Sequence, residues 1–233
     1  MNKLIFFLLL LSCANYEPLT GGKKDINTPI FLYSVPNNFS TFIKKDLKYI
    51  KIFFNEKVTL KDIDHIIINP FYLQKHIIFY PSSLPKEYIT IKFKEKLMTN
   101  TTYSICFNNC IKDDREENIL PYFIFTFSTG SFIDSIHIKG IINSKFKIKK
   151  NIAIILYNLN HTIQKPNYIA LIDLINKKYK ISYIRKGKYS LLCFNDENKN
   201  KIYEPNKKEL IFFQKKIFLL ENNKKHNINI LIK

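Results

Sequence analysis

Oxygen-bearing side chains alternate along one short loop near the C-terminal end of the sequence. The ligand order of an EF-hand calcium loop, positions 1, 3, 5, 7 (a backbone carbonyl) and 9, is matched by Asp196, Asn198, Asn200, Ile202 and Glu204. Two positions depart from that order, because Lys201 stands where the sharp turn requires glycine and Lys207 stands where a bidentate Glu closes the site. Glu209 could take that role only in a longer loop. The pattern leaves two interpretations open, a calcium loop and a metal-free polar turn.

Residue patterns of catalytic sites are missing from the sequence. None of the five histidines stands at metal-ligand spacing. No G-x-S-x-G, H-E-x-x-H, P-loop or G-x-G-x-x-G motif occurs. The acidic run Asp113–Asn118 is interpreted as a solvated turn between two strands, with a cation or partner contact as the alternative. We therefore expect no catalysis, and no cofactor other than the calcium that the Asp196 loop leaves open.

The N-terminus predicts export and a lipid anchor. Lys3 precedes the apolar run Leu4–Leu11, which spans only ~12 Å as a helix and is too short for a bilayer core of ~30 Å. The run ends in Leu10-Leu11-Ser12-Cys13, which resembles the bacterial lipobox, where the cysteine thiol is acylated and becomes the first residue. We expect a cleaved signal peptide over residues 1–12, lipidation of Cys13 and a tether through residue 28. An ordinary secretory signal with an incidental cysteine is the alternative.

The remaining cysteines do not suggest a disulfide framework. Cys106 and Cys110 stand four apart on a predicted strand and its end, so their Cα atoms would lie ~13 Å apart, too far for a disulfide. Cys193 lies in an apolar stretch and is interpreted as a small buried residue.

Alternation of apolar and polar residues with period two dominates the sequence after the tether, which predicts half-buried β-strands. In the first half the predicted strands are 30–35, 48–54, 65–69, 76–80, 87–94, 103–108 and 122–128. In the second half they are 133–142, 150–158, 167–174, 178–184, 188–194, 209–219 and 226–232. We therefore predict an all-β protein of two β-sandwich domains in series, over residues 29–130 and 131–233. Seven strands in the first half match the count of an Ig-like sandwich.

Short motifs spread over residues 13–200 resemble a known family. They are Cys13-Ala14-Asn15, Thr20–Asp25, Ser34-Val35-Pro36, Phe53–Glu56, Leu60-Lys61-Asp62, Asn100–Tyr103, Phe125–Gly130 and Ile133-Asp134-Ser135. Together they resemble Bacteroidota-type lipoproteins with an N-terminal bacterial Ig-like domain of the S-layer-protein (SbsA) type. In the second half, Lys186–Tyr189 and Asp196–Asn200 look like a transthyretin-like or carboxypeptidase-regulatory-like sandwich. Members of the family extend past the position where this sequence ends, so the resemblance implies a C-terminally shortened member.

The resemblance also carries expectations about place and about single residues. It implies anchoring in the outer membrane and no catalytic activity, and Ala14 is not the Asp that retains some lipoproteins in an inner membrane. Tyr103, preceded by Asn100-Thr101-Thr102, resembles the corner tyrosine of Ig-like folds, whose hydroxyl bonds to a nearby backbone group.

The net charge of +18 comes almost wholly from lysine, since 35 of the 37 basic residues are Lys. Specific recognition of nucleic acid favours Arg, so we attribute the excess mainly to AT-rich codons and expect no nucleic acid partner. Residues 131–233 hold 21 basic and 7 acidic residues, a net of +14, against +3 for residues 13–130. The basic residues of interest in the second half are Lys145, Lys147, Lys149, Lys177, Lys178, Lys180, Arg185, Lys186 and Lys188. They are interpreted as a solvated face or as a surface for anionic envelope lipid or polysaccharide.

These observations predict a lipid-anchored outer-membrane protein, facing the periplasm or the exterior, with a structural or binding role. The first alternative is an adhesin or glycan-binding module, which an exposed stack of aromatic side chains on one sheet face would support. The second is an envelope enzyme, which would need a concave pocket with converging polar groups.

Overall fold

The computed structural model describes residues 22–71, 76–81, 84–144, 152–159, 167–173, 175–219 and 225–232. The signal peptide, Cys13, the first part of the tether and the lysines at 145, 147 and 149 lie outside these residues. The described chain contains strands and short 3-10 turns, and none of its helices is long and apolar enough to cross a membrane. The all-β prediction is confirmed.

Seven strands of the first half form two packed layers. They are β1 (Phe31–Val35), β2 (Tyr49–Leu60), β3 (Ile67–Asn69), β4 (Ile77–Tyr80), β5 (Lys86–Phe93), β6 (Thr102–Asp113) and β7 (Ile119–Ser128). One layer has the order β1-β2-β5-β4 and the other the order β3-β6-β7. β2 joins both layers, because its first part pairs with β5 and its last three residues pair with β6. This is the strand order of an Ig sandwich.

Alternate residues of these strands fill the space between the two layers. Fully buried members of this core include Ile50 and Ile52 of β2, Ile89 and Ile91 of β5, and the β7 aromatics Phe125 and Phe127. Because side chains of a strand alternate between faces, Lys51 and Thr90, which stand between these isoleucines on β2 and β5, lie on the outer face of the sheet. The outer face of β2 and β5 is therefore set by the same pattern that builds the core.

The second half forms another two-layered sandwich. Its strands are β8 (Ile136–Ser144), β9 (Ile152–Asn158), β10 (Tyr168–Ile169), β11 (Leu171–Asp173), β12 (Lys178–Ile184), β13 (Gly187–Asn195), β14 (Ile211–Leu219), β15 (Lys225–Asn227) and β16 (Ile230–Ile232). One sheet has the order β10-β9-β13-β14. The other has the order β11-β12-β8-β15, and β16 also pairs with β8. β15 and β16 run parallel to β8.

A close approach of two backbone segments explains one glycine of this domain. A Cβ atom on Gly140 of β8 would lie 1.8 Å from the carbonyl oxygen of Ile228, between β15 and β16. The Tyr179 hydroxyl donates to the same carbonyl oxygen at 2.7 Å. Only a residue without a side chain lets the C-terminal segment lie across β8 in this way.

Several predicted strands differ from the observed ones where a strand changes its partner. The strand predicted over 103–108 continues to Asp113 as β6, through a bulge where Asn109 has a positive φ of 53°. The strand predicted over 167–174 is two short strands in different sheets, because the chain crosses between the layers at Ala170. Between β2 and β3 the chain forms one 3-10 turn, η1, over Ile63–His65.

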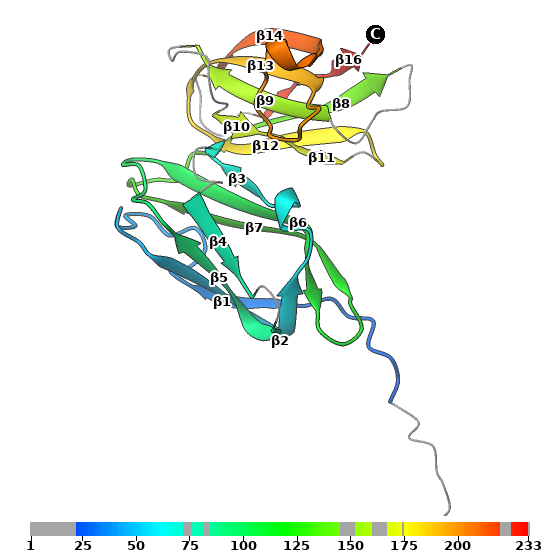
Figure 1. Ribbon diagram of the computed structural model, residues 1–233. Helices are drawn as coiled ribbons and strands as arrows, with labels where there is room; N and C mark the ends of the chain where they lie inside the picture. The colour runs from blue at the N-terminus through cyan, green and yellow to red at the C-terminus, as the bar shows by residue number, and fades with distance from the viewer. Residues whose placement is uncertain are drawn as a thin grey trace, which may run out of the picture.

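The two sandwiches contact each other through a buried seam between β3 and β6 of the first and β10 and β12 of the second (Figure 1). An apolar cluster spans the seam and combines Ile67 and Cys106 with Ala153, Ile155, Tyr157, Ile169, Leu192 and Phe194. The Asn69 side chain crosses it, donating to the Ile169 carbonyl at 3.0 Å and accepting from the Ile169 N–H at 2.8 Å. The Phe71 N–H also donates to the Asn167 carbonyl at 2.9 Å. The domains are therefore joined by paired polar groups as well as apolar contact.

Candidate functional site

The Asp196 loop follows β13 and leads into the 3-10 turn η3 (Pro205–Lys207). Asp196 is only 4% exposed, and its two carboxylate oxygens accept the backbone N–H groups of Asn200 at 3.0 Å and Lys201 at 2.9 Å. Burial raises the pKa of Asp196, while these N–H donors and the charge of Lys201 oppose the rise. The first residue of the calcium pattern thus holds the loop backbone.

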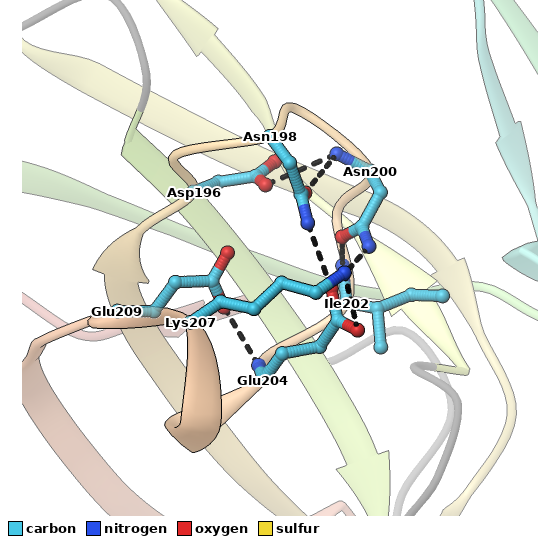
Figure 2. Close-up of polar contacts among 7 residues, drawn as sticks. All are labelled: Asp196, Asn198, Asn200, Ile202, Glu204, Lys207 and Glu209. Carbon is cyan, nitrogen blue, oxygen red and sulfur yellow. Dashed lines mark hydrogen bonds and ion pairs between the residues drawn. The ribbon is translucent and has the colours of Figure 1, made fainter.

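The other polar side chains of the loop converge on Glu204 rather than on an empty centre (Figure 2). Asn198 and Asn200 donate their amide N–H groups to one Glu204 oxygen at 2.8 and 2.7 Å. The Lys207 ammonium lies 3.0 Å from the other oxygen and is the main reason that the pKa of Glu204 is lowered. The Asn200 side-chain oxygen accepts the N–H of Ile202 at 2.7 Å. The amides therefore turn donors inward, where a calcium ion would require oxygens.

Glu209 lies beside this cluster and is 3% exposed. One of its oxygens accepts the Glu204 N–H at 2.6 Å, and the other is buried without a hydrogen-bond partner among the described residues. The described chain contains no group of three or more His, Cys, Asp or Glu side chains arranged to hold a metal ion. Because Lys207 already supplies a positive charge to the loop, the geometry favours the metal-free turn of the two interpretations.

Lys201, the residue in the glycine position of the loop, reaches the other domain. It adopts a positive φ of 62°, and its ammonium donates to the Asp64 carbonyl of η1 at 3.1 Å. Burial lowers the pKa of Lys201, and the charges of Asp196 and Asp64 act in the opposite direction. The loop that resembles a calcium site is thus a contact between the two sandwiches.

Tyr103 stands at the start of β6 and is fully buried. Its hydroxyl accepts the N–H of Met98 at 2.7 Å, and its ring stacks on Phe127 at a centroid distance of 5.1 Å. This is the backbone contact that a corner tyrosine of an Ig-like fold makes, so its place is structural.

The acidic turn between β6 and β7 is exposed at Asp114, Arg115 and Glu117, as a solvated turn requires, but its first residue is buried. Asp113 is 1% exposed and accepts three backbone N–H groups, from Glu116 and Glu117 at 2.8 Å and from Asn118 at 3.0 Å. Burial alone would raise the pKa of Asp113, but the donors outweigh it and the pKa is lowered. The signal for such a turn is an Asp at the end of a strand, because its side chain can accept the N–H groups three to five residues later.

The cysteines of the described chain are buried and free. Burial raises the pKa of Cys106 and of Cys193 to about 12, and that of Cys110 to about 11. Since the thiolate is the reactive form, these groups are poor nucleophiles and metal ligands.

The described basic residues of the second domain lie at several places along β12 and after it. Lys177 and Lys178 lie at the start of β12, whereas Lys186 and Lys188 follow its end, ~20 Å away along the strand. Lys180 lines a cavity of about 20 Å³ in the domain seam. Arg185 donates to the Asn100 carbonyl of the first domain at 2.8 Å. The solvated face and the surface for anionic lipid or polysaccharide both stay predictions, and three of the lysines concerned lie outside the described residues.

A surface that the sequence did not locate lies on the outer face of β1, β2 and β5. Tyr33 stacks on Phe53 with a centroid distance of 4.4 Å and an interplanar angle of 12°. On the other side of Phe53, the ring centroid of Tyr88 lies 5.5 Å from that of Phe53. The ammonium groups of Lys51 and Lys86 lie 5.1 and 5.5 Å from the centre of the Tyr88 ring. A depression of about 390 Å³ next to this row is lined by Tyr49, Lys51, Tyr80, Pro81, Lys86, Tyr88 and Thr90. We call the aromatic row and the depression the tyrosine–lysine face.

Comparison with known proteins gives a family match for the first domain. Residues 25–129 match the family model described as a bacterial Ig-like domain. A search of curated proteins found no match. The N-terminal part of the bacterial S-layer protein SbsC shows 11% identity and a TM-score of 0.30 over 84% of this chain and 45% of its own. A variant of the major pilin subunit BcpA of Bacillus cereus shows 10% identity and a TM-score of 0.28 over 87% of this chain and 70% of its own.

This chain therefore spans less than half of the S-layer fragment, and scores this low support no argument about function. The Ig-like part of the predicted resemblance is confirmed, while the lipoprotein and Bacteroidota parts stay predictions. Residues 25–129 of this chain are therefore similar to a bacterial Ig-like domain.

Proposed function

We propose that this protein is anchored in the cell envelope through a lipid on Cys13 and holds a firmly joined pair of β-sandwiches at the membrane surface. The observation that carries this proposal is the direction of the chain. Residues 22–28 are almost wholly exposed and leave the first sandwich on the side away from the second (Figure 1). A membrane attached before residue 22 would thus lie next to the first domain, with the second domain held farther out.

The contacts between the domains support a structural role. The Asn69–Ile169 pair, the Lys201–Asp64 contact and the Arg185–Asn100 contact join the sandwiches at three places. An interface with several specific polar contacts and a buried apolar cluster restrains relative motion more than a free linker does. The outer membrane is the membrane we propose, because the sequence after Cys13 lacks the retention residue.

Cys13→Ala tests the anchor. We expect the wild-type protein in the membrane fraction and labelled by radioactive palmitate, and the variant unlabelled and in the soluble fraction. Cys106→Ala is the matched control, because it removes a thiol that is buried in the seam and should leave label and fractionation unchanged. A Cys13→Ala protein that stays with the membrane would contradict the lipid anchor.

The second candidate function is a glycan-binding module, and the tyrosine–lysine face is the observation that favours it. Aromatic rings exposed in a row offer flat apolar surface beside polar hydroxyl groups, which suits the mixed surface of a sugar ring. Affinity electrophoresis of the protein in gels containing polysaccharide tests this function. Unretarded migration in every polysaccharide gel would count against it.

A further inference from the structure

The tyrosine–lysine face is built by the register of four strands. Tyr33, Phe53 and Tyr88 are direct neighbours across β1, β2 and β5. The next row on the same face joins Val35, Lys51, Thr90 and Tyr80 across β1, β2, β5 and β4. The third joins Tyr49 of β2 to Lys92 of β5. Aromatic and lysine side chains therefore alternate over a continuous part of the sheet.

These aromatic rings are more exposed than a sandwich requires. Tyr33 is 52% exposed, Tyr49 51% and Tyr80 42%, although each belongs to or borders a well-packed sheet. A contiguous exposed apolar surface on a soluble domain commonly marks a binding site. The face is also concave beside the aromatic row, where the depression of about 390 Å³ falls in the size range of small-ligand sites.

The charge of the face is positive and not neutralised by the described chain. Lys51, Lys86 and Lys92 lie over tyrosine rings, at 5.1, 5.5 and 5.9 Å from the ring centres. None of the three takes part in an ion pair between described residues. Cation–π contacts hold these ammonium groups in place while leaving their charge available to an anion.

We infer that the tyrosine–lysine face binds an acidic polysaccharide, a chain of sugar rings that carry carboxylate groups. This inference rests on the glycan-binding candidate and adds the charge of the ligand and its site. The C–H faces of the sugar rings contact the rings of Tyr49 and Tyr88, and the carboxylates pair with Lys51 and Lys86. Tyr80 and Thr90 line the same depression, and their hydroxyls bond the sugar hydroxyls.

Two other anionic partners fit the face less well. A membrane surface would meet protruding aromatic side chains, whereas the lysines and tyrosines here border a depression. Recognition of a nucleic acid favours Arg, whereas the lining of this depression contains Lys51 and Lys86 and no arginine. Both partners are included as outcomes of the test.

The experiment measures binding of the full chain, in detergent, to an octamer of galacturonic acid and to the methyl ester of the same octamer. The ester keeps the sugar rings and removes the charge. We expect the acid to bind at least tenfold more tightly than the ester, with an affinity that falls as salt rises. Tyr88→Ala and Tyr49→Ala should each raise the Kd about threefold to tenfold. Lys51→Gln should raise the Kd about twofold to fivefold and weaken its salt dependence.

Matched controls are taken from outside the face. Phe42→Ala removes a 74% exposed aromatic ring, and Lys215→Gln removes an exposed charge from β14 of the second domain. Both should keep the wild-type Kd. The unfolding midpoint of every variant is measured first, and Tyr49→Ala tests the face independently if Tyr88→Ala does not fold.

The possible results distinguish failure of the acidic ligand from failure of the glycan-binding candidate and of the envelope anchor. Equal binding of acid and ester would overturn the acidic ligand and leave the glycan-binding candidate intact. No binding of either octamer at millimolar concentration would overturn both and leave the envelope anchor untouched. Tighter binding to a thymidine octanucleotide or to anionic phosphatidylglycerol vesicles, weakened by the same variants, would overturn the inference in favour of that partner.

Discussion

The Asn69 side chain offers a direct measure of how strongly the two sandwiches support each other. Asn69 is 6% exposed, and its amide exchanges two hydrogen bonds with the backbone of Ile169, which is 3% exposed. In Asn69→Ala the N–H and the carbonyl of Ile169 remain buried in the seam without a partner. Leaving a buried backbone group unsatisfied costs about 1–3 kcal/mol. We therefore expect the free energy of unfolding to fall by about 2–4 kcal/mol.

Urea denaturation of the full chain, followed by far-UV circular dichroism, is the assay. We expect one transition for the wild type and a lower midpoint for Asn69→Ala. Asn176→Ala is the control, because its side chain also bonds, to Asp173, but in an exposed turn, so its loss should cost well under about 1 kcal/mol. If Asn69→Ala loses no more stability than Asn176→Ala, the polar seam does not join the domains and the structural role is refuted.

Three further predictions concern single side chains. Asp113→Ala should lower the free energy of unfolding by about 2–3 kcal/mol in urea, because three turn N–H groups lose their acceptor. Since its pKa is lowered in the folded state, Asp113 stabilises the fold above its unfolded pKa of about 3.9 and loses this effect as the pH falls through the folded value. A wild-type and variant acid limb of equal slope would contradict this. Tyr103→Phe should cost about 1 kcal/mol of thermal stability, because the Met98 N–H loses its partner, and an unchanged Tm would refute the corner role. Millimolar calcium should leave the Tm of the wild type unchanged and raise that of Lys207→Glu, and a rise in the wild type would instead support a calcium loop.

The strands were predictable because, in a sandwich, side chains alternate between the core and the outer face, so burial repeats with the period seen in the sequence. In β5, for example, Ile89, Ile91 and Phe93 are buried. Thr90 and Lys92, which alternate with them in the sequence, are half-buried. The changes of partner were not predictable in this way. The bulge at Asn109 and the crossing at Ala170 depend on which strand lies alongside, and that information is not local.

The site residues also depend on information that the local sequence does not contain. The spacing from Asp196 to Glu204 correctly placed these polar side chains in one loop, yet it could not say whether amides point oxygens or N–H groups inward. The tyrosine–lysine face joins Tyr33, Phe53 and Tyr88, which stand 20 and 35 residues apart in the sequence. Only the register of β1, β2 and β5 makes them neighbours, so composition could suggest an aromatic surface but not locate it.

The lysine excess has different meanings at different positions. The codon bias inferred from the sequence would account for the number of lysines, but not for which ammonium groups meet which acceptors. Lys207 lies against Glu204 at the position where an EF-hand loop carries its last acidic ligand, and Lys201 binds the Asp64 carbonyl across the seam. A calcium ion would gather the loop by drawing oxygens together, and it would release the loop when the ion is lost. The ammonium of Lys207 is covalently attached, so we expect the loop and the Lys201 contact between the domains to persist when calcium is removed.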